Sequence, residues 1–185
     1  FLYVTNMRST SVSVINTSTG TVVDTISDVG NWPLAITMHP NGKAVYVANY
    51  SDDSVAVIST SDKSIIKTIP VQESPMDIIS TADGDYMLVA NSRSNSVSIV
   101  QTSDNTVIQT ISVGDLPYAI TNMENSGLFY ISNIGSGTIS VIQNSSFAFN
   151  INTGLVAYYP FDDDANDYSG NGHHGVKNGG VRYVS

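Results

Sequence analysis

The sequence contains no cysteine, which excludes disulfide bonds, thiolate zinc sites and a cysteine nucleophile. Charged residues make up only 12% of the chain, and acidic residues outnumber basic ones by 16 to 7. The resulting net charge of −9 argues against binding to a nucleic-acid backbone. No apolar run approaches the roughly 18 residues of a membrane-spanning helix, and no signal peptide is visible. Ser, Thr and Asn are abundant instead, which favours β-strands with short polar turns over helices.

One short segment recurs four times at a nearly constant spacing. Each copy is a strand-like run that ends in asparagine, and the steps between the asparagines are 43, 42 and 42 residues. The four asparagines are Asn6, Asn49, Asn91 and Asn133. Three prolines, Pro33, Pro75 and Pro117, recur at the same spacing. A fixed period of this length indicates a repeat architecture.

Each repeat contains four strand-like runs. The run that ends in asparagine and the run after it are apolar at nearly every position, which predicts strands covered on both faces. The third run carries a polar residue (Asp24, Lys67 or Gln109) and is expected to be the exposed outer strand. The fourth run follows the repeated proline and is expected to lie nearest a central channel. Four strands in about 42 residues predict an all-β fold, a β-propeller with about 3.5–4 blades in residues 1–143.

The asparagine segments also resemble a known repeat. Tyr3-Val-Thr-Asn6 has the signature of the YVTN β-propeller family of surface-layer and surface-antigen proteins, and Tyr46-Val-Ala-Asn49 is a close variant. The resemblance implies that the four asparagines tie the turns that follow them through side-chain hydrogen bonds. Family propellers have seven blades, and this chain begins within a repeat without an initiator Met. We therefore expect missing sequence to complete the ring.

The period stops after Gln143. Residues 144–153 are predicted to form either the last outer strand or a linker. The segment Gly154-Leu-Val-Ala-Tyr-Tyr-Pro-Phe161 and the glycine-rich stretch after it resemble the opening of a laminin-G-like, concanavalin-A-like jellyroll. Residues 154–185 are therefore expected to be the truncated start of such a domain.

An acidic loop follows this opening segment. Its carboxylates suit calcium, which takes 6–8 oxygen ligands, although turn capping and solubility are the plainer interpretation. The candidate calcium ligands are Asp162, Asp163, Asp164 and Asp167. His173 and His174 are expected to be surface residues, because neighbours on a strand point to opposite faces.

Two aromatic residues are candidate ligand contacts. Trp32 precedes the proline of one repeat and Tyr118 follows that of another, so both are expected near the mouth of the propeller, where packing between blades is the alternative role. Acid–base candidates near the inner strands do not recur from one repeat to the next. These candidates are His39, Glu73, Asp77 and Asp115.

The pairing of a YVTN-like propeller with a laminin-G-like opening segment implies, by resemblance, a non-catalytic extracellular surface protein. The propeller would act as a scaffold, and the jellyroll would be an adhesion module that binds carbohydrate or protein at the cell surface. No cofactor is expected apart from calcium, and self-association is allowed. Two alternatives stay open. The chain could be a subunit of an extracellular assembly or filament completed by its neighbours, or a lactonase-like or lyase-like propeller enzyme with its site in missing blades.

Overall fold

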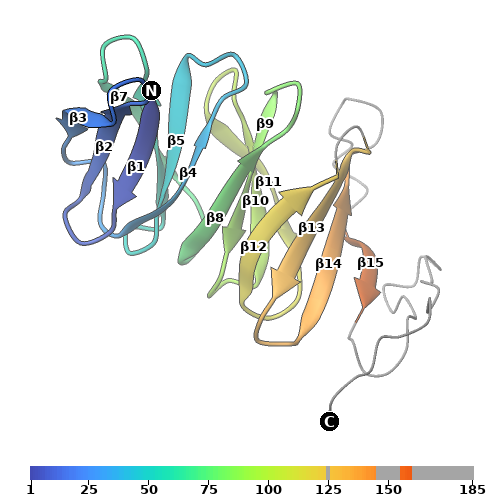
Figure 1. Ribbon diagram of the computed structural model, residues 1–185. Helices are drawn as coiled ribbons and strands as arrows, with labels where there is room; N and C mark the ends of the chain where they lie inside the picture. Colours follow the sequence, from blue (N-terminus) through green and yellow to red (C-terminus); the bar gives the residue numbers. More distant parts are fainter. Residues whose placement is uncertain (124–125, 145–154, 160–185) are drawn as a thin grey trace, which may run out of the picture.

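The computed structural model describes residues 1–123, 126–144 and 155–159, and in this part of the chain all regular structure is β-strand. The strands form four antiparallel sheets that stand side by side in chain order (Figure 1). Their bounds are β1 (Leu2–Asn6), β2 (Ser11–Asn16), β3 (Thr21–Ile26), β4 (Pro33–Met38), β5 (Ala44–Asn49), β6 (Ser54–Ser59), β7 (Ile65–Pro70), β8 (Pro75–Ser80), β9 (Tyr86–Asn91), β10 (Ser96–Gln101), β11 (Thr106–Ser112), β12 (Pro117–Asn122), β13 (Leu128–Asn133), β14 (Thr138–Gln143) and β15 (Leu155–Tyr159). The described residues contain no helix that is long and apolar enough to cross a membrane.

Each sheet is one blade of a β-propeller. The sheet orders are β4-β5-β6-β7, β8-β9-β10-β11 and β12-β13-β14-β15, with a three-stranded β1-β2-β3 sheet before them. Strands β4, β8 and β12 begin at the repeated prolines and contact one another from blade to blade, so they form the inner layer. The predicted all-β propeller fold is confirmed. Outer strands β3, β7 and β11 carry mostly exposed side chains, as the sequence predicts.

The last blade takes its fourth strand from the region after the repeats. Strand β15, residues 155–159, pairs with β14 and completes the sheet. This strand lies within the segment that resembles the opening of a jellyroll. The proposed jellyroll at 154–185 stays a prediction, because residues 160–185 lie outside the described part of the chain.

The two middle strands of a blade supply side chains to both of its faces. On β5, Val45 and Val47 pack toward the β1–β3 sheet, whereas Tyr46 and Ala48 pack toward the β8–β11 sheet. Successive residues of a strand point to opposite faces, so a strand between two blades must be apolar at every position. This packing accounts for the unbroken apolar runs of the sequence.

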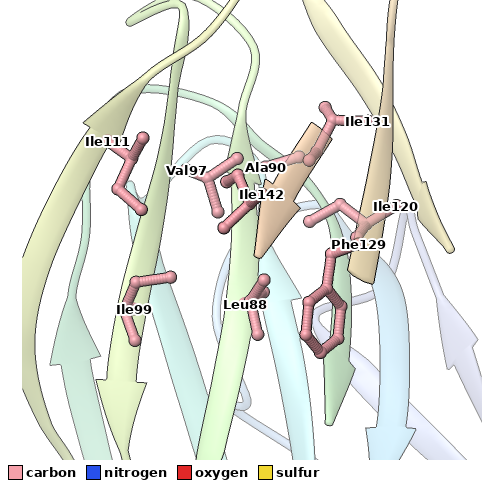
Figure 2. Packing of buried hydrophobic residues seen from close by; sticks show 9 residues of the cluster. All are labelled: Leu88, Ala90, Val97, Ile99, Ile111, Ile120, Phe129, Ile131 and Ile142. Carbon is pink, nitrogen blue, oxygen red and sulfur yellow. The ribbon is translucent and has the colours of Figure 1, made fainter. Parts of the chain in front are cut away.

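The same arrangement continues toward the C-terminal blade. Figure 2 shows nine side chains that point toward one another between the β8–β11 and β12–β15 sheets. Leu88 and Ala90 of β9 meet Phe129 and Ile131 of β13 there, and all four are buried. The core of the molecule therefore consists of layers between blades, each built by two repeats.

Candidate functional site

The strand directions place all crossovers between blades at one edge of the sheets. These segments (27–32, 71–74 and 113–116) lie beside the turns that join the second and third strands of each four-stranded blade (50–53, 92–95 and 134–137). We call these six segments, together with the matching β1–β2 turn 7–10, the crossover rim. Strands β4, β8 and β12 of the inner layer each begin at this rim. The other turns, such as 39–43 and 81–85, lie at the opposite edge.

The turns of the rim hold the crossovers in place. Asp53 has a positive φ of 49°; its carbonyl accepts the N–H of Val71 (2.9 Å) and its side chain accepts the N–H of Ser74 (2.8 Å). Asn95, with a φ of 48°, makes the same two bonds one blade later, to Val113 and Leu116. Asp and Asn tolerate this left-handed conformation better than most residues. One turn of each blade thereby fixes the chain that leads into the next.

The repeated asparagines lie beneath this rim; Asn49, Asn91 and Asn133 are buried, and Asn6 is half-buried. The Nδ2 atom of Asn91 donates to the Oγ atoms of Ser96 (3.3 Å) and Ser98 (2.9 Å), and Asn133 and Asn6 make the corresponding bonds in their own blades. Asn49 donates to the carbonyl of Val29 on the crossover (2.7 Å). The amides link the end of one strand to the start of the next.

The residue before each repeated proline has a left-handed backbone, with φ of 53° at Trp32, 57° at Ser74 and 51° at Leu116. The carbonyl of each one accepts an N–H from the adjacent turn of the same blade. The N–H donors are Tyr50, Ser92 and Ile134. Each blade therefore presents one pair of residues at the rim: an aromatic pair, a pair of serines and an aliphatic pair.

The aromatic pair combines an exposed indole with a partly buried phenol ring. Trp32 is 49% exposed, and its ring stacks on that of Tyr50 with 6.0 Å between centroids and 27° between planes. The guanidinium carbon of Arg93 lies 6.0 Å from the centroid of the Tyr50 ring, in the range of a cation–π contact. Tyr118 is 50% exposed on β12, in another blade, and makes no ring contact with Trp32.

Two members of this cluster were not predicted from the sequence. Tyr50 and Arg93 belong to turns of the same kind in successive blades, and alignment of the repeats gives that equivalence. It does not reveal that the Arg93 side chain reaches back across the gap to Tyr50. That contact depends on the angle between two blades, which no local pattern encodes.

Asp77 is an acid–base candidate whose carboxylate is hydrogen-bonded and partly buried. It lies on β8; its Oδ1 accepts the N–H of Ile78 (2.9 Å), and its Oδ2 accepts the N–H of Ile120 on β12 (2.8 Å). Burial raises the pKa of the Asp77 carboxyl above its ordinary value, although the two N–H donors oppose this effect. The carboxylate therefore joins the inner strands of two blades.

The remaining acid–base candidates are not gathered around Asp77. Glu73 and Asp115 lie in crossovers of the rim, whereas His39 lies at the opposite edge, beside Gly84. In residues 1–123, 126–144 and 155–159 there is no group of three or more His, Cys, Asp or Glu side chains that could hold a metal ion. The predicted calcium ligands Asp162, Asp163, Asp164 and Asp167 lie outside the described residues.

Comparison with known protein families assigns this propeller to a family. Residues 1–112 match the family described as lactonase, seven-bladed β-propeller. No curated protein matches the chain significantly.

Solved structures share the fold at low identity. Hydrazine synthase of Kuenenia stuttgartiensis is similar with a TM-score of 0.74 and 24% identity, over 84% of this chain and 44% of that one. A candidate 6-phosphogluconolactonase from Bacteroides uniformis gives 0.66 and 18%, over 80% and 48%. The dihydro-heme d1 dehydrogenase NirN gives 0.70 and 13%, over 83% and 34%. The chain thus spans less than half the length of each of these structures.

These findings correct the functional expectation from the sequence. The predictions of a non-catalytic extracellular adhesion scaffold and of no enzymatic activity are wrong, because the matching family is one of lactonases. The error came from the pairing of the two family resemblances, and the absence of recurring acid–base residues weighed against the enzyme alternative. A propeller site takes single side chains from several blades, so it need not repeat. Since the match covers more than half of the sequence, the chain belongs to the lactonase family of seven-bladed β-propellers.

Proposed function

We propose that the protein to which these blades belong hydrolyses lactones. The observation that carries this proposal is the family match over residues 1–112, which includes the inner strands β4 and β8. In the reaction, water adds to the lactone carbonyl and the bond from that carbon to the ring oxygen breaks. The ring oxygen takes up a proton, and the product is an open-chain hydroxy acid that releases a proton at neutral pH. No redox cofactor is required by this balance.

The described blades would contribute a wall and one mouth of the site. Strands β4, β8 and β12 form the inner layer, and their starting prolines lie at the crossover rim. The side chain of Asp77 accepts backbone hydrogen bonds through both oxygens, so we assign it to holding β8 and β12 together rather than to activating water. The acid–base groups are then supplied by other blades of the ring, in line with the sequence-based alternative of a propeller enzyme.

The test is proton release from lactones in weakly buffered solution. Five- and six-membered sugar lactones would be offered to the complete protein, and open-chain esters of similar size serve as the control for unspecific ester cleavage. We expect a rate that saturates with lactone concentration and exceeds spontaneous hydrolysis at least about 100-fold, the range typical of a single positioned acid–base group. Hydrolysis at the spontaneous rate for every lactone, by protein that is folded by circular dichroism, would refute the proposal.

A further inference from the structure

We propose that Trp32, Tyr50 and Arg93 form a binding site for a ring compound that carries a carboxylate. The site lies at the crossover rim, and nothing in the family match assigns it. It deepens the proposed function, because hydrolysis of a lactone yields a carboxylate, but it is a site of binding and can be tested without turnover.

Hydrogen bonds fix the backbone that carries the exposed Trp32 ring and the partly buried Tyr50 ring. The carbonyl of Trp32 accepts the N–H of Tyr50 at 3.0 Å, and Pro33 fixes the chain on the other side. Asn31 donates to both carboxylate oxygens of Asp52, at 2.7 Å from its N–H and 2.8 Å from its Nδ2. A stacked pair fixed in this way loses little conformational entropy when a ligand covers it. The exposed indole face is therefore prepared to bind a flat or chair-shaped ring.

Arg93 supplies the positive charge of the site. Its side chain is exposed, and among the described residues it makes no ion pair. The carboxylates of the turn that carries Tyr50 are already engaged, since Asp52 binds Asn31 and Asp53 accepts the N–H of Ser74. A guanidinium over an aromatic ring retains N–H donors at its edge, and these suit a carboxylate in a two-point contact.

Glu73 is the group that competes with such a ligand. Its N–H donates to the Oγ of Ser94 at 2.9 Å, which places the Glu73 backbone beside the turn that carries Arg93. The carboxylate of Glu73 is free to turn toward Arg93 in solution, and it would then weaken anion binding. Removal of this carboxylate is therefore expected to strengthen ligand binding. If the cluster had only a structural role, removal of the carboxylate would not strengthen binding.

The neighbouring blade leaves room for the ligand. At the positions of the aromatic pair it carries Ser74 and Ser92, which are small and buried. The blade after it carries Leu116 and Ile134, which are 41% and 61% exposed. The rim thus carries small, buried side chains on the central blade and larger apolar side chains on the two blades beside it. At these two positions of the central blade, a ring lying on Trp32 meets only small side chains, so Arg93 is the long side chain of this blade that is offered to it.

Trp32 is the single tryptophan of the sequence, so its fluorescence reports on this site alone. The experiment titrates the chain with three probes that do not absorb in this range: cyclohexanecarboxylate, cyclohexanemethanol and acetate. We expect saturable quenching or a spectral shift with the ring carboxylate only. Equal responses to cyclohexanecarboxylate and cyclohexanemethanol would overturn the role of Arg93, and no saturable response would overturn the site.

The chain offers a matched control for the arginine. Arg8 occupies the corresponding turn of the first sheet, where Met7 stands in place of Tyr50. Arg93→Gln should weaken cyclohexanecarboxylate binding about tenfold, the effect of losing one charge-assisted contact, while Arg8→Gln should not change it. Glu73→Gln should strengthen binding. Equal losses in the two arginine variants would show a general charge effect and overturn the proposal.

The outcome separates this inference from the proposed function. Lactone hydrolysis without ring-carboxylate binding would refute only the rim site. Binding without hydrolysis of any lactone would refute only the enzymatic activity.

Discussion

At the scale of single residues, the repeated asparagine is the most informative position. Its buried amide bonds to hydroxyl groups of the next strand, and in the blade of Asn49 it also bonds to the crossover. The amide oxygens of Asn49, Asn91 and Asn133 are buried without a hydrogen-bond partner among the described residues. The Nδ2 donor is therefore the group that makes these side chains stabilising.

Asn91→Ala is expected to lower the free energy of unfolding by about 2–3 kcal/mol, because it leaves two buried hydroxyl groups without their donor. Urea denaturation measures this loss. The control is Asn41→Ala in an exposed turn, where the side chain accepts one N–H bond, and it should cost less than about 1 kcal/mol. Equal costs in the two variants would contradict the anchoring role.

Asp77 should give an unusual dependence of stability on pH. Its pKa in the folded protein is raised above 3.8 because burial disfavours the charged carboxylate. The folded state then holds this proton more tightly than the unfolded state. The contribution of Asp77 to stability is fully present below pH 3.8 and falls as the pH rises through the raised pKa.

Asp77→Asn tests this sign. The quantity to compare is the unfolding free energy of the unmodified protein minus that of the variant. This difference should be larger near pH 3.5 than near pH 7, because the pKa of Asp77 is raised above the usual range of an Asp carboxyl. Asp24→Asn should show the opposite trend, because a hydrogen bond from Lys63 lowers the pKa of Asp24. Asp24 lies at the surface in an ion pair with Lys63, so only the sign of its effect is compared. A difference for Asp77→Asn that grows with pH would contradict the account.

At the scale of strands and turns, close packing beneath the rim depends on glycine where the crossover passes an anchor asparagine. A Cβ at Gly30 would lie 2.4 Å from the Nδ2 of Asn49, and its φ of 127° is unfavourable for other residues. Gly20 has a φ of 70° in an open turn, with nothing within 4 Å of a Cβ. A substitution at Gly20 therefore introduces backbone strain alone, whereas one at Gly30 introduces both backbone strain and steric overlap.

Gly30→Ala should therefore cost more than Gly20→Ala. The Gly20 variant pays for the left-handed backbone only, about 1–2 kcal/mol. The Gly30 variant must also displace Asn49, and we expect a total of at least about 3 kcal/mol, with loss of the bond to Val29. Thermal or urea unfolding of both variants measures the difference. Equal costs would mean that the crossover moves freely away from Asn49.

The sequence predicted strands and blades well because their pattern is local and repeated. Proline, glycine and asparagine mark the strand ends, and apolar runs mark the strands between two blades. The rim cluster was predicted only in part. Trp32 was predicted as a ligand contact because it is an aromatic residue directly before a repeated proline. Its partners Tyr50 and Arg93 come from two different blades. Their meeting depends on tertiary geometry, and the candidate acid–base residues were scattered for the same reason.

At the scale of the whole molecule, stability depends on layers between blades. Leu88 is fully buried between two sheets, whereas Ile66 on outer strand β7 is 56% exposed. Leu88→Ala is expected to cost about 2–5 kcal/mol and Ile66→Ala less than about 1 kcal/mol. Denaturation of the two variants measures this. A small loss for Leu88→Ala would contradict stacking of the blades through continuous apolar layers.

The membership of a lactonase family makes one activity the central claim for the whole protein. The most direct measurement is the rate of proton release from a sugar lactone as its concentration rises, with the complete protein against the same sample after unfolding. The account predicts a saturating rate that unfolding abolishes. A rate that is the same before and after unfolding, for five- and six-membered lactones alike, would contradict it.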